Sequence, residues 1–245
     1  MGDLREDFTR HISSEFNEEL EELCGDLLKM GGLAERQVQL ALQAQEQFDS
    51  ELISQIKDAE QSVNAWELRI DELVAEIIAR RQPAASDLRL VLAVSKIVRD
   101  LERAGDEANK VALMAQQAAE STRFSTVGAV EVRAIGERVG RMLSDALTAF
   151  ARLDAEMALQ VARNDRDVDA IYQSALRSLA TFMIEDPREI GNVLNVMWVL
   201  RALERIGDHA TNVAEHIVYL VKGTDIRHLS VTNVEDRIRA TPDRV

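Results

Sequence analysis

The chain has 245 residues, with 43 Asp and Glu against 29 Lys and Arg, and its formal net charge is −14. Direct binding of nucleic acid needs a basic surface for the phosphates, so this charge argues against that class of protein. Only 3 Pro and 11 Gly occur, and 4% of the residues are aromatic. Together with the abundance of Ala, Leu, Glu, Gln and Arg, this composition predicts an all-α fold.

The cysteine content and the chain's hydropathy favour the cytoplasm. Cys24 is the only cysteine, so no disulfide can form within the chain and a thiol-rich zinc site is ruled out. Residues 1–16 alternate charged and polar side chains, unlike a signal peptide. No stretch approaches the ~20 consecutive apolar residues of a spanning helix. We therefore expect a cytoplasmic protein that reaches a membrane only through a partner.

In chain order, few breaks interrupt the helical pattern. Pro83 and Pro187 each end a helix, and the Ser/Thr-bearing segment 120–127 breaks the apolar periodicity between two halves. Gly31-Gly32 is a candidate kink in the first helix. After Gly223 the chain becomes polar and charged, and we expect a loosely held tail at 224–245. The pattern predicts six helices, at 9–46, 50–80, 86–119, 127–152, 155–184 and 188–222.

An internal repeat organises these helices. The sequence LERAGD at 101–106 recurs as LERIGD at 203–208, which is 102 residues later. Upstream, 63–65 corresponds to 168–170 at a spacing of 105. The repeat predicts two pseudo-symmetric three-helix bundles in tandem, because three amphipathic helices suffice to close a core. The expected boundaries are 1–122 for the first repeat, 123–223 for the second and 224–245 for the tail.

Acidic and amide side chains recur on one face of the last helix. At ~100° per residue, Glu204, Asp208, Asn212 and Glu215 fall nearly opposite the apolar face and are expected to point outward. The third predicted helix repeats this stripe with Glu102, Asp106 and Asn109. The second predicted helix adds Glu60, Asn64, Glu67 and Asp71 along one edge of its apolar face.

These stripes are candidate metal sites. Carboxylates at i and i+4 repel each other unless a cation lies between them, and hard oxygen ligands suit Mg²⁺, Ca²⁺, Mn²⁺ or iron. The alternative is a solvated acidic face, neutralised in part by Arg103 and Arg205. Gly105 and Gly207 cost helix stability in mid-helix, so each needs a reason, such as a close helix contact or room for a ligand. The candidate ligands are Glu67, Asp71, Glu102, Asp106, Asn109, Glu204, Asp208 and Asn212.

The second repeat departs from the first. Tyr172 and Leu176 occupy the positions of Glu67 and Asp71, although the same helix keeps Asp165 and Asp169. The two clusters would therefore differ in ligand set or nuclearity.

The histidines and the cysteine are interpreted without a functional role, and no catalytic motif is found. His209 and His216 are interpreted as partly exposed surface residues, and Cys24 as a small core residue. No Ser-His-Asp order or glycine-rich phosphate loop occurs, so the sequence predicts a protein that is not an enzyme.

Two copies of the pattern LERxGDxAxxVA, ending in NVAEHIVYLVKG at 212–223, resemble the PhoU family of phosphate-transport regulators. Further matches are VN at 63–64, ELRID at 67–71 and TFMIEDPR at 181–188. The resemblance spans most of the chain. It implies multinuclear metal clusters, with iron in some members, held by E(D)-x-x-x-D motifs that map to Glu67/Asp71, Glu102/Asp106 and Glu204/Asp208.

The resemblance also implies a function. It implies a cytoplasmic negative regulator of phosphate uptake and phosphate-starvation signalling, an adaptor between the ATPase subunit of a phosphate ABC transporter and a sensor histidine kinase. A homodimer is expected from the amphipathic helices. Two other readings stay open: a metal-storage or metal-dependent hydrolytic bundle, and a purely structural bundle without a ligand.

Overall fold

The computed structural model describes residues 14–47, 50–120 and 127–226. Every element of these segments is helical, and no strand occurs among them. The elements are α2 Ser14–Gln47, α3 Ser50–Arg81, α4 Ala85–Glu120, α5 Ala129–Arg152, α6 Ala155–Glu185, the short 3₁₀ helix η1 Pro187–Glu189, and α7 Ile190–Lys222.

Five of the predicted helices match within two residues at both ends, because their termini depend on local residues. Asp154 caps α6 by accepting a hydrogen bond from the backbone N–H of Met157 at 3.0 Å. Pro187 stops α6 and opens η1, and Gly223, at φ +66°, ends α7. The predicted start of the first helix, residues 121–126 of the predicted hinge at 120–127, and most of the predicted tail lie outside the described residues.

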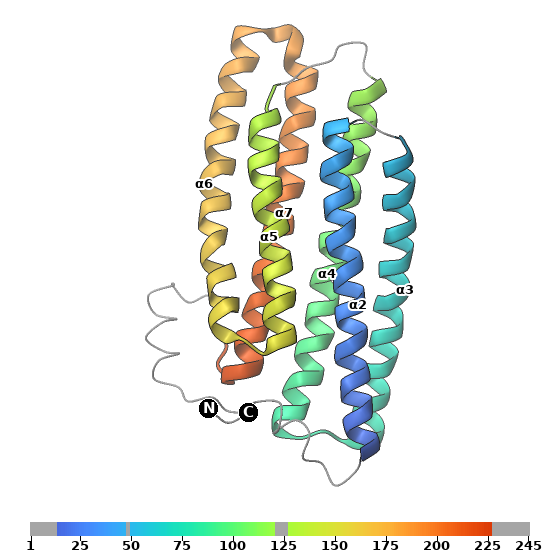
Figure 1. Cartoon of the computed structure of the whole chain (residues 1–245). Coiled ribbons are helices and arrows are strands. Elements are labelled where there is room, and N and C mark those ends of the chain that lie inside the picture. Colours follow the sequence, from blue (N-terminus) through green and yellow to red (C-terminus); the bar gives the residue numbers. More distant parts are fainter. Residues whose placement is uncertain (1–13, 48–49, 121–126, 227–245) are drawn as a thin grey trace.

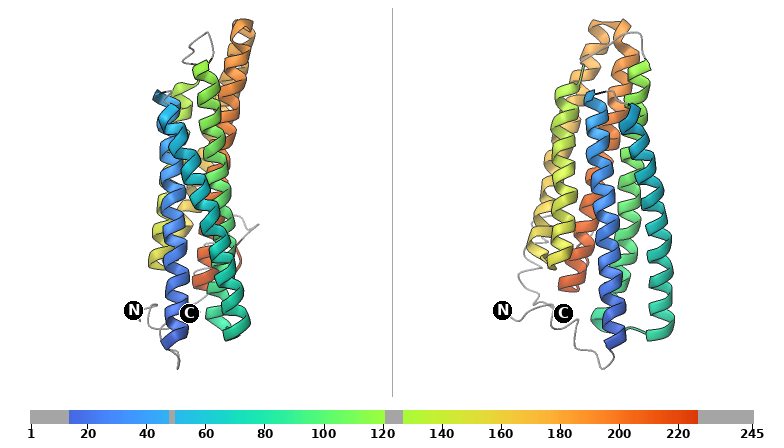
Figure 2. Two further views of the ribbon diagram at one scale, coloured as in Figure 1. Left: turned by 90° about the vertical axis from the view of Figure 1, so that its right-hand side faces the viewer. Right: turned by 45° about the vertical axis from the view of Figure 1, so that its right-hand side comes forward.

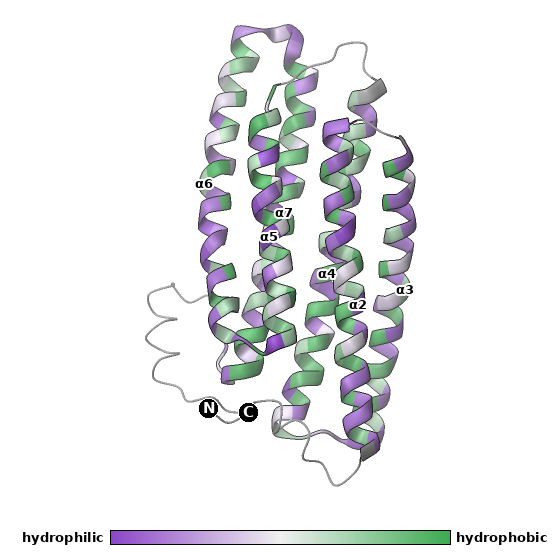
Figure 3. Ribbon diagram, viewed as in Figure 1, coloured by the Kyte–Doolittle hydropathy of each residue, from purple (hydrophilic) through white to green (hydrophobic). Residues whose placement is uncertain are grey.

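The six long helices form two three-helix bundles side by side, as predicted. α2, α3 and α4 make the first bundle, and α5, α6 and α7 make the second (Figure 1). All axes run along one direction, so the molecule is long and narrow (Figure 2). Apolar and polar residues alternate around each helix (Figure 3). The apolar faces meet in one continuous core that includes both bundles.

Close approach of α2 and α5 joins the repeats. A Cβ at Gly31 would lie 2.3 Å from a methyl of Leu147, and a Cβ at Gly136 would lie 2.3 Å from a methyl of Leu42. Both glycines and both leucines are separated by 105 residues (136 − 31 and 147 − 42), so the contact is reciprocal. α2 is one helix through Gly31-Gly32, and the absence of a side chain at Gly31 admits the neighbouring helix.

The repeated mid-helix glycines also mark close helix contacts. At Gly105 of α4, the carbonyl oxygen accepts a hydrogen bond of 2.9 Å from the amide of Gln37, a side chain that is completely buried. A Cβ at this position would lie 2.8 Å from that amide's oxygen. A Cβ at Gly207 would lie 3.2 Å from Val139. Of the two reasons that the sequence left open for these glycines, the structure supports helix packing.

Two further sequence expectations concern the core and the membrane. Cys24 packs against the core, and burial raises the pKa of its thiol to about 12, so it is not a reactive thiolate at neutral pH. In the described part of the chain, no helix combines the length and the apolar character needed to cross a membrane.

Candidate metal centres

The first acidic cluster lies between α3 and α4. Glu67 and Asp71 come from α3, and Glu102 and Asp106 come from α4. Burial, followed by the charges of Asp71 and Asp106, raises the pKa of Glu67. Burial, followed by the charges of Asp106 and Glu67, raises the pKa of Glu102. The four carboxylates that the sequence selected in this repeat therefore share one region of negative potential.

The second cluster lies between α6 and α7, the counterparts of α3 and α4. Burial, followed by the charges of Asp169 and Asp208, raises the pKa of Asp165 to about 6. Burial and the charge of Asp208 likewise raise the pKa of Glu204. The sequence selected Glu204 and Asp208 but left Asp165 and Asp169 out of the candidate ligands.

This pair was visible in the sequence, although it was not counted among the candidate ligands. Asp165 and Asp169 form an i, i+4 acidic pair seven residues, or two helical turns, before the positions of Tyr172 and Leu176. The same spacing on the same helix face therefore marks them as ligand candidates.

In each of the two clusters, an arginine forms an ion pair with one of the carboxylates. Arg201 Nη1 contacts both carboxylate oxygens of Glu204, at 2.8 and 2.7 Å, and Glu204 is buried rather than outward-facing as expected. Arg103 lies 3.5 Å from Glu102. Among the described residues, no salt bridge reaches Asp71, Asp106 or Asp208. Each cluster thus contains at least one carboxylate that no arginine contacts directly, although the charges of Arg201 and Arg205 still act on Asp208.

The two asparagines among the candidate ligands point to other partners. Asn109 donates a hydrogen bond of 2.8 Å to Glu60 of α3. Asn212 donates one of 3.0 Å to Asp100 of α4. Both amides therefore tie neighbouring helices together in this structure, and Asn212 lies at the boundary between the repeats.

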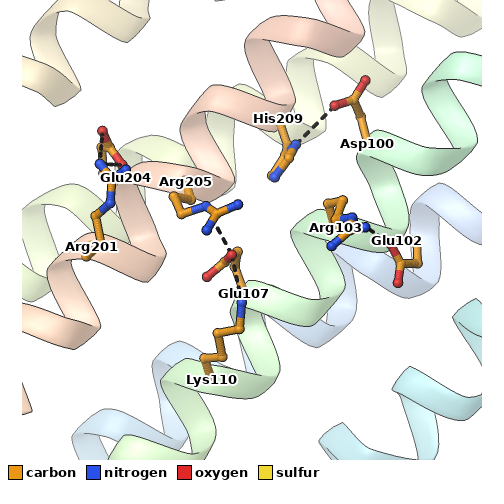
Figure 4. A network of polar contacts seen from close by, with 9 residues as sticks. All are labelled: Asp100, Glu102, Arg103, Glu107, Lys110, Arg201, Glu204, Arg205 and His209. Carbon is orange, nitrogen blue, oxygen red and sulfur yellow. Dashed lines mark hydrogen bonds and ion pairs between the residues drawn. The ribbon is translucent and has the colours of Figure 1, made fainter.

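A polar network at that boundary corrects the expectation that both histidines are partly exposed surface residues: His216 is buried, and only His209 stays partly exposed. His209 Nδ1 lies 3.0 Å from Asp100 Oδ1, and His216 Nε2 lies 3.5 Å from Asp100 Oδ2 (Figure 4 draws the His209 contact). His216 is buried and the side chain of His209 is 14% exposed. The apolar periodicity of α7 placed both histidines on the outer face of the second bundle. In the structure, α4 of the first bundle lies against that face.

Arg205 and Lys110 complete the network (Figure 4). Arg205 Nε lies 3.1 Å from Glu107 of the opposite repeat, and Lys110 contacts the same carboxylate at 2.9 Å. Glu107 is almost completely buried. Arg205 therefore pairs with an acid of the opposite repeat, and this pair links the two repeats rather than neutralising the acidic stripe.

The chemistry of both clusters fits a hard cation, although their present geometry does not. The donors are carboxylate oxygens, as Mg²⁺, Ca²⁺, Mn²⁺ and iron prefer. In the described segments, no three Asp, Glu, His or Cys side chains converge closely enough to hold an ion. Binding would therefore require rotation of the longer, partly exposed side chains.

The raised pKa of Asp165 predicts how stability depends on pH in a metal-free protein. An unfolded Asp titrates near 3.9, so between about pH 4 and pH 6 the folded state holds a proton that the unfolded state has lost. Stability should therefore fall as pH rises through this window. Thermal unfolding in chelator from pH 4 to 7 should show this fall, and Asp165→Asn should reduce it; an unchanged slope in the variant would contradict the assignment.

Fold and clusters together define the class of this protein. It is a duplicated helical-bundle protein with a carboxylate cluster between the corresponding two helices of each half. A family model described as the PhoU domain matches the chain twice, at residues 27–115 and 132–217. The chain belongs to the PhoU family.

Relatives and solved structures agree with this assignment. The chain is 52% identical over 234 residues to the phosphate-specific transport system accessory protein PhoU homolog of Pseudomonas aeruginosa, covering 96% of each. It is 41% identical over 220 residues to the phosphate-specific transport system accessory protein PhoU of Escherichia coli, covering 90% of each. The names describe accessory proteins rather than enzymes.

Two crystal structures share the fold. PhoU from Pseudomonas aeruginosa superposes with a TM-score of 0.83 at 55% identity, over 85% of this chain and 100% of that chain. The phosphate transport system regulatory protein PhoU from Streptococcus pneumoniae gives a TM-score of 0.78 at 28% identity, over 86% and 98%.

Proposed function

We propose that this chain is a cytoplasmic accessory regulator of a phosphate-specific transport system, restraining phosphate uptake and phosphate-starvation signalling. The observation that carries the proposal is the match of both repeats, over nearly the whole chain, to accessory proteins of phosphate transport. More specifically, we propose that the protein is an adaptor between the ATPase subunit of a phosphate ABC transporter and a sensor histidine kinase.

The shape of the molecule supports an adaptor. Long parallel helices offer extended faces that can contact two partners at once (Figure 2). Signal transfer requires only that the two conformational states of a partner bind this chain with different affinity. Phosphate itself then need not bind to this protein. We further propose a homodimer as the working assembly.

The clusters are proposed to hold divalent or iron ions, with more than one ion in a cluster. Glu67, Asp71, Glu102 and Asp106 would hold metal in the first repeat, and Glu204 and Asp208, joined by Asp165 and Asp169, in the second. Asn109 and Asn212 would join only after release from Glu60 and Asp100. A bound cation would replace carboxylate repulsion by attraction and stiffen the faces that meet partners.

Removing one charge from each cluster tests the metal proposal. The double variant Asp106→Asn/Asp208→Asn should lower metal content at least tenfold, because it removes from each site a carboxylate that no arginine contacts directly. Elemental analysis of protein purified without chelator measures this. The control Asp58→Asn/Asp167→Asn removes two exposed charges from other faces of α3 and α6. Equal metal content in both double variants would remove the site assignment.

Partner binding tests the adaptor. Purified ATPase subunit and kinase should each retain the chain on a column, and phosphate concentration during growth should change kinase repression by the wild-type protein. The Asp106→Asn/Asp208→Asn variant should weaken repression, and the control variant should not. If the variant keeps both interactions and still represses the kinase, metal binding is not needed for signalling. If the wild-type chain does not bind both partners, the adaptor proposal is wrong.

A further inference from the structure

The two repeats can be aligned helix by helix, and the alignment shows where their carboxylate clusters differ. α4 and α7 align at a spacing of 102 residues, and α3 and α6 align at a spacing of 105. Burial supports the second spacing, because Val63 of α3 and its counterpart Val168 of α6 are each 1% exposed. At these spacings Glu102 of α4 corresponds to Glu204 of α7 (102 + 102), so the surroundings of these two carboxylates can be compared directly.

In the first repeat, Glu102 belongs to a group of carboxylates from both helices. The charge of Glu67 of α3 helps to raise the pKa of Glu102, and the charge of Asp71 helps to raise that of Glu67, in each case after burial. Arg103 Nε lies 3.5 Å from Glu102 Oε2, which is longer than an ordinary charge-assisted hydrogen bond (Figure 4). A cation can therefore draw on carboxylates of α3 and α4 without breaking a close arginine contact.

In the second repeat, Glu204 has different neighbours. The counterparts of Glu67 and Asp71 are Tyr172 and Leu176, which carry no charge at neutral pH. Arg201 Nη1 instead contacts both carboxylate oxygens of Glu204, at 2.8 and 2.7 Å (Figure 4). The side chain of Glu204 is only 11% exposed, so water screens this ion pair weakly. Arg201 thus already supplies Glu204 with a positive partner.

This contact opposes a metal ion in two ways. A cation on Glu204 would need the same two oxygens, and it would be repelled by the guanidinium at that distance. Burial raises the pKa of Asp208, the next carboxylate of the cluster along α7, and the charge of Arg201 opposes this shift. The side chain of Arg201 is itself 48% exposed, so it can rotate into solvent without opening the core.

We propose that Arg201 is an internal competitor of the metal ion in the second repeat. Metal reaches Glu204 only by displacing the guanidinium, so the second centre binds cations more weakly than the first and fills after it. The inference rests on the metal proposal above and adds to it an order of filling and the residue that sets this order.

Titration with Mn²⁺, a hard divalent cation, measures the two centres separately. Glu67→Gln/Asp106→Asn removes two carboxylates from the first centre and leaves the second, whereas Asp165→Asn/Asp208→Asn does the reverse. Equilibrium dialysis of each full-length double variant gives the dissociation constant of the remaining centre. The constant of the second centre should be larger by at least about threefold. Tighter binding by the second centre would refute the proposed order.

Replacing Arg201 tests the competitor directly. Added to the variant that keeps only the second centre, Arg201→Met should lower the dissociation constant for Mn²⁺ at least about tenfold, because it removes both the contact and the repulsion. Arg138→Met is the matched control in the same repeat. Arg138 has a side chain that is 41% exposed and pairs with the exposed Asp167 at 3.0 Å. The control should change the constant by less than about twofold, and equal effects of the two substitutions would contradict the proposal.

Thermal unfolding separates competition from mere bracing of the helix. In metal-free protein, Arg201→Met should lower the Tm by about 2–4 °C, because Glu204 stays buried and loses its partner. Saturating Mn²⁺ should abolish this difference, since the ion then neutralises Glu204 in both proteins. If Arg201 only braces α7, the loss will remain in Mn²⁺ and the proposal is wrong. If the wild-type chain binds no Mn²⁺, the metal proposal itself fails, and this inference fails with it.

Discussion

Replacing Asp100 by alanine is expected to lower the free energy of unfolding by about 3 kcal/mol, because the carboxylate is the shared partner of three side chains between the repeats. Burial alone would raise its pKa, but hydrogen bonds with His209, His216 and Asn212 lower it to about 2. The alanine variant leaves these groups buried without that acceptor. Denaturant unfolding at pH 7 measures the loss.

The low pKa of Asp100 gives the prediction a second readout. An unfolded Asp titrates near 3.9, so the carboxylate stabilises the fold fully above that pH and loses its effect as pH falls through about 2. The difference between wild type and Asp100→Ala should therefore shrink in acid. Asp167→Ala removes an exposed carboxylate paired with Arg138 at 3.0 Å and should cost only about 0.5 kcal/mol. Similar losses in both variants would show that the network does not hold the repeats together.

The Gly31→Val substitution is expected to cost about 3 kcal/mol, because even its Cβ would lie 2.3 Å from a methyl of Leu147. Gly32→Val is the matched control in the next position of the same helix. Gly32 is exposed and a Cβ there meets nothing within 4 Å. The control should therefore be neutral or stabilising by a few tenths of a kcal/mol, since valine favours helix over glycine. Thermal and denaturant unfolding compare the two.

A compensating change separates overpacking from any other cause. Leu147→Ala alone should destabilise by about 2–3 kcal/mol by leaving a cavity. Combined with Gly31→Val, the total loss should be well below the sum of the two, because the valine occupies the vacated space. Additive losses would mean that the α2–α5 approach does not limit the side chain at position 31.

Sequence alone was sufficient for the helices and for their duplication. Helix bounds followed from Pro83, Pro187 and Gly223, whose backbone preferences act within a turn and need no distant partner. The duplication followed from the two LERxGD segments. The carboxylates of each pair in the first repeat could be grouped because i, i+4 spacing fixes which side chains share a helix face, and the resemblance to the PhoU family supplied the same motifs.

Tertiary structure decided what each helix face meets. Periodicity assigns a face to one bundle but cannot reveal a second bundle, so His209 and His216 were read as surface residues although both contact Asp100 of α4. The same limit explains Asn212, which shares a helix face with Asp208 yet binds Asp100. Asp165 and Asp169 belong to the second cluster because of the register of α6 against α7. Side-chain packing sets this register, and the register determines which turn of α6 faces Asp208. The spacing of residues along the sequence gives the direction of each side chain around its helix axis. Which neighbour lies in that direction depends on contacts between segments far apart in the chain.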